Sequence, residues 1–387
     1  MRTSHAVLAG GGGLIAAGLG AGVYGLVHSH SYVLRRRSLL IPGQARPLRI
    51  LHISDAHTLA RHTKRLRFIR DLAETSPDLV VLTGDMIAEP DAVAPVLAAL
   101  DELLEVPGVF VFGSNDYVAP TFKNPLAYLG GPSNRGAKKG QPDRRPLPWR
   151  EMRAEFKARG WADLTNARAQ MSVAGWDLEF VGVDDPHMHL DRFPDPVDGP
   201  AAGDSAGTAR SAGAAGTAIS AGKTRPASPT GNSGKPATNP GDSVGKLGDA
   251  VVGEQPRMRI GVAHAPYQRV LNQMVADGCS LIFAGHTHGG QVCLPPHRAL
   301  VSNCDLDPSL ASGLFDWPRF PDSEEPIKGD GAAIAKEKAG GAWVQVSAGI
   351  GSATYMPLRT FCPPEAILLD VVPVAAQPAG VNSRALP

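Results

Sequence analysis

Short apolar runs rich in Val, Ile and Leu recur along this chain, and they limit the folds that it can adopt. Each run is too short for a typical helix, and its nearly continuous hydrophobicity is typical of a strand buried on both faces. The runs lie at 48–54, 78–84, 108–113, 178–183, 258–263, 280–285, 343–349 and 366–372. Stretches with a helical spacing of apolar residues lie between some of them, at 63–74, 91–106 and 267–278. This alternation predicts a layered α/β domain in which helices cover a sheet.

The N-terminal segment is also apolar. Residues 6–27 carry no charge, and their number is about what a helix needs to cross the hydrocarbon core of a bilayer. A cleaved signal peptide would end in a small-residue cleavage site, which we do not find convincingly, and a buried soluble helix is the other alternative. We interpret residues 1–30 as a single-pass membrane anchor made of one transmembrane helix.

The orientation of this anchor depends on the charges that flank it. Arg2 favours a cytoplasmic N-terminus, whereas the arginines at 35–37 favour the opposite orientation. Because residues 32–42 have the composition of a strand in the folded domain, we discount those arginines. We therefore expect the folded domain to lie outside the cytoplasm.

Two stretches do not share the α/β pattern. Residues 197–250 are almost wholly Gly, Ala, Ser, Thr, Pro and Asp with scattered Lys and Arg, which predicts a disordered low-complexity insertion. Residues 131–150 form a basic loop, which is either a solvated surface loop or a contact surface for anionic lipid or substrate. The folded domain is thus predicted in two parts, 31–196 and 251–375, followed by a flexible tail at 376–387.

Composition excludes some classes of function. The net charge is +1 and only 6% of residues are aromatic, which argues against a nucleic-acid-binding protein. The four cysteines, Cys279, Cys293, Cys304 and Cys362, include no C-x-x-C pair. Their spacing therefore predicts neither a zinc ribbon nor a disulfide framework.

Potential metal ligands follow the predicted strands where these end. They are Asp55 with His57, Asp85, Asn115 with Asp116, His264, and His286 with His288. In open α/β sheets, ligands gather outside the carboxyl ends of the strands, and carboxylate, amide and imidazole groups bind divalent metals. Each residue alone has an ordinary explanation, such as a turn at Asp85, a helix cap at Asp55 or a structural role for His264. The ordered set predicts a metal site.

This ordered set, D-x-H, G-D, N-D, H and G-H-x-H, resembles the calcineurin-like metallophosphoesterase superfamily. The resemblance runs from about Leu48 to Val372, apart from the insertions. It is closest to the membrane-anchored bacterial branch, whose last motif also reads GHTHGGQ, here residues 285–291, and whose chain closes with PPE, here residues 363–365. The family implies a four-layer α-β-β-α sandwich that holds two divalent metal ions.

The resemblance also implies a role for each ligand. Asp55, His57 and His288 would bind one metal ion, Asp85 would bridge both, and Asn115, His264 and His286 would complete the second. Two metals roughly 3.5–4 Å apart clamp the attacking and leaving oxygens of a phosphoryl displacement and favour deprotonation of a bridging water. Mn, Fe, Zn and Mg all suit such a set of nitrogen and oxygen ligands, so the sequence does not identify the metal.

One motif departs from the family. Its usual third motif is G-N-H-D or G-N-H-E, and this chain has Gly113-Ser114-Asn115-Asp116. Without a gap, Ser114 takes the asparagine position; with a shift of one residue, Asn115 remains the ligand and Asp116 replaces the catalytic histidine. We prefer the shift, because an amide oxygen is the better hard ligand. Arg359, in a loop after the run at 343–349, is either a surface residue or a phosphate clamp.

The predicted function is a membrane-anchored, dinuclear metal-dependent phosphoesterase that hydrolyses phosphate ester or pyrophosphate bonds, on an envelope or lipid-linked substrate. Its expected partners are the phosphoester substrate and the membrane, with no nucleic acid, and the oligomeric state is not predicted. Two alternatives remain: a phosphodiesterase of the same fold that acts on soluble nucleotides, and a metal-bound scaffold without activity.

Overall fold

The computed structural model describes residues 18–42, 46–121, 145–195, 257–318, 326–327, 330–334 and 341–374. All of these residues belong to one compact unit, which the chain forms from Met1–Asp195 and Gln255–Pro387. The predicted insertion at 197–250, the predicted tail at 376–387 and most of the basic loop at 131–150 lie outside the described residues.

The first sheet has seven strands in the order β13-β1-β15-β2-β3-β4-β5. In chain order these are β1 (Val33–Pro42), β2 (Leu48–Ile53), β3 (Leu79–Leu82), β4 (Gly108–Phe110), β5 (Ala162–Asp163), β13 (Gly331–Ile334) and β15 (Glu365–Val374). Strands β2 to β5 are parallel, and β15 joins β2 in antiparallel fashion. The stretch at 32–42, predicted to be a strand, is therefore β1, which pairs in parallel with β15.

The second sheet has six strands in the order β12-β14-β9-β8-β7-β6. They are β6 (Ala167–Val173), β7 (Trp176–Gly182), β8 (Arg257–Val262), β9 (Leu281–Ala284), β12 (Gly313–Trp317) and β14 (Ala342–Val346). The central strands β7, β8, β9 and β14 are parallel, and the two edge strands are antiparallel to their neighbours. A small antiparallel pair, β10 (Cys293–Leu294) and β11 (Arg298–Ala299), follows β9.

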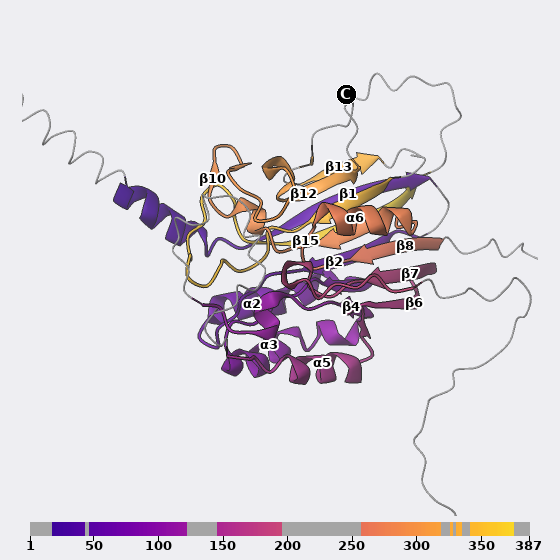
Figure 1. Cartoon of the computed structure of the whole chain (residues 1–387), viewed down its shortest axis with the longest axis horizontal. Helices are drawn as coiled ribbons and strands as arrows, with labels where there is room; N and C mark the ends of the chain where they lie inside the picture. The colour runs from indigo at the N-terminus through magenta and orange to yellow at the C-terminus, as the bar shows by residue number, and fades with distance from the viewer. Residues whose placement is uncertain are drawn as a thin grey trace, which may run out of the picture. The chain divides into compact units, whose positions relative to one another are not determined.

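Besides a helix at 18–28, the described α-helices are α2 (Thr63–Asp71), α3 (Val93–Leu100), α4 (Ser114–Tyr117), α5 (Trp149–Ala158) and α6 (Gln268–Ala276). Short 3-10 helices lie at η1 (Leu72–Thr75), η2 (Pro90–Ala92), η3 (Leu103–Glu105), η5 (Pro186–Met188), η6 (His288–Gly290) and η7 (Pro308–Leu310). In α2, Leu66 and Ile69 are buried three residues apart, which is the spacing that places side chains on one helical face. Figure 1 shows α2, α3 and α5 together along one side of the sheets.

Three buried cores define the layers. Leu51 and Val80 pack with residues of α2, α3 and α5 on the outer face of the first sheet. Their neighbours Ile50 and Val81 point the opposite way and pack against the second sheet, since side chains alternate along a strand. The outer face of the second sheet packs against α6, for example through Leu271. The prediction of a mixed α/β domain with buried parallel strands is confirmed.

The predicted transmembrane segment is described only in part. Residues 18–28 are helical, and the rest of the span predicted at 6–27 lies outside the described residues. The described helices include none whose length and apolar character would suit a membrane crossing. The helix contacts the folded domain near its end, where Arg359 donates its backbone N–H to the carbonyl of Gly25 at 3.1 Å and the rings of Tyr24 and Phe361 lie 5.4 Å apart.

Candidate metal centre

The candidate ligands follow the carboxyl ends of parallel strands in both sheets. Asp55 and His57 follow β2, Asp85 follows β3, Asn115 lies in α4, the next element after β4, His264 follows β8, and His286 and His288 follow β9. Parallel strands that lie side by side end at the same edge of a sheet. The topology therefore gathers at one edge residues that are far apart in the sequence.

The backbone at these turns is unusual. Five of the candidate ligands have a positive φ: Asp55 (50°), His57 (41°), Asp85 (56°), His286 (67°) and His288 (50°). This left-handed conformation is uncommon for residues with a side chain and costs of order 1–3 kcal/mol each. Such strain persists only where surrounding contacts impose it, and it concentrates at functional sites.

Two groups of side chains could each hold a metal ion. Asp55, His57 and His288 form one group, and Asp55, Asp85 and His264 form the other, with the ligand atoms of each group within 4.8 Å of one another. Both groups are buried and share Asp55. The first group is the set that the family resemblance implies for one metal.

Asp85 belongs to the second group and also lies close to the first. Its Oδ2 is 3.5 Å from His57 Nε2 and 3.4 Å from His264 Nε2. Asn115 holds the same carboxylate, because its backbone N–H donates to Oδ1 at 2.7 Å and its side-chain amide donates to Oδ2 at 2.6 Å. Its carboxylate therefore lies between one imidazole of each group, whereas the residue that both groups contain is Asp55; the bridging role of Asp85 stays a prediction.

The distances between ligand atoms fit a metal ion. Bonds of about 2.1 Å from a metal to nitrogen or oxygen put neighbouring ligand atoms about 3.0–3.4 Å apart. His57 Nε2 and His288 Nε2 are 3.1 Å apart. Asp55 Oδ1 is buried and has no hydrogen-bond partner, which is costly unless a cation binds it. Carboxylates and imidazoles are the donors that divalent transition metals prefer.

His286 lies at the edge of the centre. Its ring centroid is 5.1 Å from that of His264, and its Nε2 lies 3.3 Å from the side-chain amide of Asn303. Its backbone N–H donates to Asp55 Oδ2 at 2.9 Å. The structure thus brings His286 beside the second group, although the two groups described above do not include it.

Burial sets the protonation of these side chains. It lowers the pKa of His57 to about 4 and holds the pKa of His288 well below its usual value, so both imidazoles are neutral, as metal ligands must be. Burial also raises the pKa of Asp55 to about 6. Burial alone would lower the pKa of His264, but Asp85 and other carboxylates raise it, so His264 must lose a proton when it binds a metal.

A hydrogen-bond network orients the ligands. Thr83 accepts at its backbone carbonyl from His264 Nδ1, at 2.7 Å, which leaves Nε2 of that ring facing Asp85. The Thr83 hydroxyl donates to Ser54 Oγ at 2.7 Å, and Ser54 in turn donates to Asp55 Oδ2. Such partners fix the tautomer and direction of metal ligands.

Two glycines allow the turns to approach. A Cβ on Gly285 would overlap with the side chains of Ser54 and Asp55, and one on Gly113 would overlap with Asp85. The space that these glycines leave is therefore occupied by the ligands themselves.

Asp116 lies under the centre, with its carboxylate directed at the backbone. Oδ2 accepts from the N–H of Asp85 at 2.7 Å and of Gly113 at 3.0 Å, and Oδ1 accepts from Met86 at 2.7 Å and Ile87 at 3.3 Å. Burial and the charge of Asp85 raise its pKa to about 7. This geometry favours a role in shaping the turn at Asp85, whereas the predicted contact with substrate remains untested.

Arg359 is buried and its donors face the protein. Its Nη2 donates to the carbonyl of Ala348 at 2.6 Å and lies 3.3 Å from His288 Nδ1, and further bonds join its guanidinium to the carbonyls of Gly349, Gly351 and Cys362. The alternative in which Arg359 is a surface residue is therefore wrong. Because its donors bind these backbone carbonyls, Arg359 holds together the turns that surround His288. A contact of Arg359 with the phosphate of a substrate stays a prediction.

Three residues near the centre, Asp185, His187 and Asn303, were not singled out in the sequence. Asp185 is fully buried and carries an oxygen without a hydrogen-bond partner, and burial raises its pKa to about 7. The ring of His187 lies 4.5 Å from that of His286, which also contacts Asn303. The available signal was the Asp184-Asp185 pair directly after the run at 178–183, which follows the same strand-end pattern as the other ligands.

Comparisons with known proteins bear on this centre. Residues 48–185 match the family model described as calcineurin-like phosphoesterase. A solved structure that is similar, the crystal structure of TT1561 of Thermus thermophilus, is 12% identical with a TM-score of 0.29, and the match covers 62% of this chain and 83% of that one. Comparison with curated proteins found no match. The matched segment ends before His264 and His288, which the fold brings to the same centre.

Proposed function

We propose that this chain, in which residues 48–185 match the calcineurin-like phosphoesterase family, hydrolyses a phosphate ester or pyrophosphate bond with two divalent metal ions. The observation that carries the proposal is the pair of ligand groups that share Asp55; the second contains Asp85, whose Oδ2 is also 3.5 Å from His57 Nε2 of the first. A four-layer sandwich of the metallophosphoesterase type agrees with the helix and sheet layers described above.

The ligand set leaves positive charge for a substrate. The two groups contain two carboxylates, Asp55 and Asp85, and the imidazoles of His57 and His288 add no charge. The ligands would therefore neutralise only part of the charge of two divalent cations. Two bound metal ions would supply charge stabilisation for the phosphoryl oxygens and would ease deprotonation of the attacking water. The chain itself holds the ligands and their turns in place through the hydrogen bonds of Asp116 and Thr83 and through those of Arg359 to the carbonyls of Ala348 and Gly349, which limits reorganisation during the reaction.

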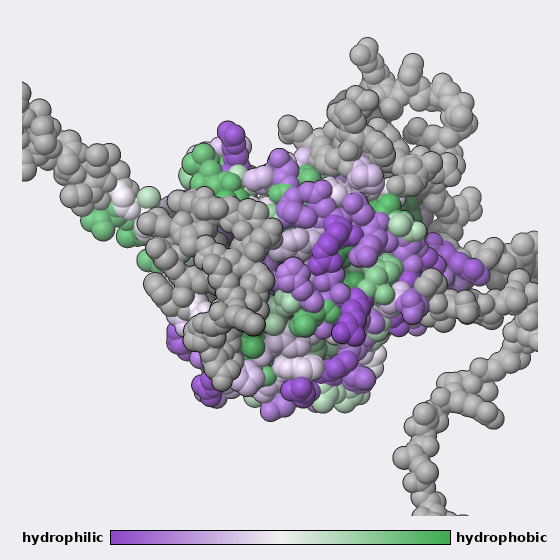
Figure 2. All heavy atoms as spheres, in the orientation of Figure 1, coloured by the Kyte–Doolittle hydropathy of each residue, from purple (hydrophilic) through white to green (hydrophobic). Residues whose placement is uncertain are grey.

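We further propose that the substrate is lipid-linked or belongs to the cell envelope, and that the domain is anchored to the outer side of a membrane. Three apolar side chains of the helix at 18–28 support this, because Leu19, Val23 and Val27 are 67%, 62% and 66% exposed. Hydrophobic residues also lie on the β10–β11 hairpin in Figure 2, at the same side of the view as this helix. An apolar helix that lies in the headgroup region is a common mode of membrane attachment.

The helix also lies close to the centre. Its residue Gly25 accepts a hydrogen bond from the backbone of Arg359, whose side chain contacts His288 Nδ1. If the exposed apolar side chains of the helix at 18–28 insert into a bilayer, the surface of that bilayer lies near the candidate metal ligands. This arrangement suits a phosphoester carried on a lipid better than a soluble nucleotide.

The test is hydrolysis by the detergent-solubilised protein, with and without Mn²⁺, of an aryl phosphodiester, phosphomonoesters, nucleotides, phospholipids and sugar-nucleotide lipids. We expect metal-dependent turnover, with lipid-linked substrates preferred. A preference for nucleotides would support the soluble-substrate alternative. Bound metal without turnover on any substrate would support a scaffold and would overturn the enzymatic proposal.

A further inference from the structure

Two buried cysteines meet behind the turn that carries His288. Cys293 begins β10, and Cys362 directly precedes the Pro363-Pro364-Glu365 stretch. Both side chains belong to one small core, with Ala299, Ala311 and Ala348. These thiols are far apart in the sequence, and their spacing gave no reason to pair them.

Several contacts bring the two thiols together. Cys293 Sγ donates to the carbonyl of Gly289 at 3.2 Å, and Cys362 Sγ donates to the carbonyl of the preceding residue, His288, at 3.5 Å. The backbone of Cys293 donates to the carbonyl of Thr360 at 3.0 Å, so the two segments run side by side. A Cβ on Gly289 would lie only 2.6 Å from Cys362 Sγ. The thiols therefore occupy the same side of one turn.

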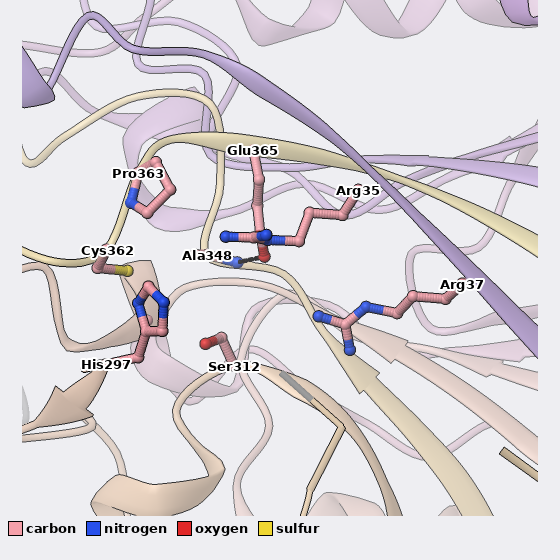
Figure 3. A pocket seen from close by; sticks show the side chains of 9 residues that line it. Arg35, Arg37, His297, Ser312, Ala348, Cys362, Pro363 and Glu365 are labelled. Carbon is pink, nitrogen blue, oxygen red and sulfur yellow. Dashed lines mark hydrogen bonds and ion pairs between the residues drawn. The ribbon is translucent and has the colours of Figure 1, made fainter. Parts of the chain in front are cut away.

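Cys362 also borders a small cavity. Its volume is about 30 Å³, on the order of two water positions. Figure 3 shows the sulfur of Cys362 directed into this space beside the ring of His297, with Arg35 and Glu365 on another wall. The cavity has room for a molecule of about the size of hydrogen peroxide next to the sulfur, although the side chain itself is only 6% exposed.

The surroundings of the cysteines differ. Cys362 lies beside a cation, because Nη1 of Arg359 is 3.8 Å from its sulfur. Burial instead raises the pKa of Cys279 to about 12 and that of Cys304 to about 11. Since the thiolate is the nucleophile, we expect Cys279 and Cys304 to react slowly, and they serve as internal comparisons for the pair.

We propose that Cys293 and Cys362 form a peroxide-sensitive thiol pair that closes into a disulfide across the candidate metal-binding turn. The Cys362 thiolate attacks one oxygen of hydrogen peroxide, the O–O bond breaks, and the departing hydroxide takes up a proton as water. The resulting sulfenic acid is attacked by the Cys293 sulfur, which loses its proton as the S–O bond breaks and a second water leaves. Two thiols are thus oxidised while one peroxide is reduced to two waters.

The disulfide would connect the two segments that hold His288. One segment carries the ligand itself, and the other carries Arg359, which contacts His288 Nδ1. The link therefore restrains the ligand without occupying the metal site. This inference does not depend on phosphoesterase activity, because its readout is a covalent bond.

The experiment treats the full-length protein with a small molar excess of hydrogen peroxide, blocks the remaining thiols by alkylation, and maps disulfides by peptide mass spectrometry. We expect one linked peptide pair that contains Cys293 and Cys362 and is lost on reduction, with Cys279 and Cys304 alkylated. The Cys293→Ala variant should instead accumulate a sulfenic acid on Cys362 that a dimedone probe captures.

A matched control is Cys279→Ala, which also removes a buried thiol but should leave the Cys293–Cys362 link unchanged. The proposal is overturned if Cys293 and Cys362 of the wild-type protein remain fully alkylatable after peroxide, or if they pair with other cysteines. Because this outcome is read from the wild-type protein, it stands even where a variant fails to fold.

Discussion

Replacement of Asp116 by Asn tests whether its carboxylate stabilises the turn at residues 85–87, beside the candidate metal centre. The Asp116 carboxylate accepts four backbone N–H groups, two at each oxygen, and it is fully buried. An Asn side chain has one oxygen, so two of these donors would lose their acceptor and face an NH₂ group instead. We therefore expect Asp116→Asn to destabilise the fold as well as the centre.

The magnitude follows from the number of donors left unpaired. Each buried donor without a partner costs about 1–3 kcal/mol, so two of them cost roughly 2–6 kcal/mol. The carboxylate of Asp116 is itself disfavoured by burial and by Asp85, which raise its pKa to about 7. Its loss relieves part of that penalty, so we expect the lower half of the range, about 2–4 kcal/mol. At about 2–4 °C per kcal/mol, the melting temperature should fall by roughly 5–15 °C.

The assay is thermal unfolding of the wild-type protein and the variant, each after chelation and each with metal added back. Asp71→Asn, a change of the same chemistry at an exposed position of α2, is the control and should leave the melting temperature unchanged. The reasoning is refuted if Asp116→Asn unfolds at the wild-type temperature after chelation, binds metal normally and loses only turnover. That result would show that Asp116 acts on the substrate, as the sequence suggested.

Three further predictions concern the ligands and the N-terminal segment. Asp85→Asn should remove metal and lower turnover by more than about 100-fold, because positioning partners of ligands alone cost 10–100-fold; metal analysis showing full occupancy with normal activity would contradict this. His286→Ala and His288→Ala should each lose mainly one metal ion, and not the same one, since their side chains lie beside different ligand groups; elemental analysis showing no loss from either variant, or never more than one metal in the wild type, would refute the two-metal proposal. Removal of residues 1–30 should release the protein from membranes and leave its activity on small model substrates unchanged, because it takes away both the apolar segment and the exposed face of the helix at 18–28; sedimentation with membranes at high salt would show that another part of the chain is an anchor.

The sequence predicted the strands of the buried core well, because both faces of those strands are apolar. The run at 78–84, for example, contains β3, and the run at 280–285 contains β9. It did not predict β10 and β11, which have two residues each and no periodicity. It also passed over β6, whose residues are mostly half-buried and mixed in polarity. Short edge elements depend on tertiary pairing, which a local pattern does not contain.

The candidate ligands were predictable for a topological reason. Once the strands are taken as parallel and buried, their carboxyl ends must share an edge, and polar residues at those ends must meet. The roles of Asp116 and Arg359 were not predictable in the same way. Their side chains bind backbone groups of distant turns, and the direction of a side chain depends on partners that only the fold supplies. The contact between Cys293 and Cys362 was not predictable for the same reason, because it joins two segments that are distant in the sequence.

The turns of the centre are held by bonds between one another. Asp55 donates its N–H to the carbonyl of Gly84, His57 donates to the carbonyl of Asp85, and Gly351 donates to the carbonyl of Asp55. The left-handed conformations of these ligands would be unfavourable in isolated turns. Because each turn supplies acceptors or donors to the next, the strain is offset by hydrogen bonds that form within the first sheet and, at Gly351, between the two sheets. The arrangement of the candidate ligands is therefore a property of the folded protein, which the chain establishes through its own hydrogen bonds.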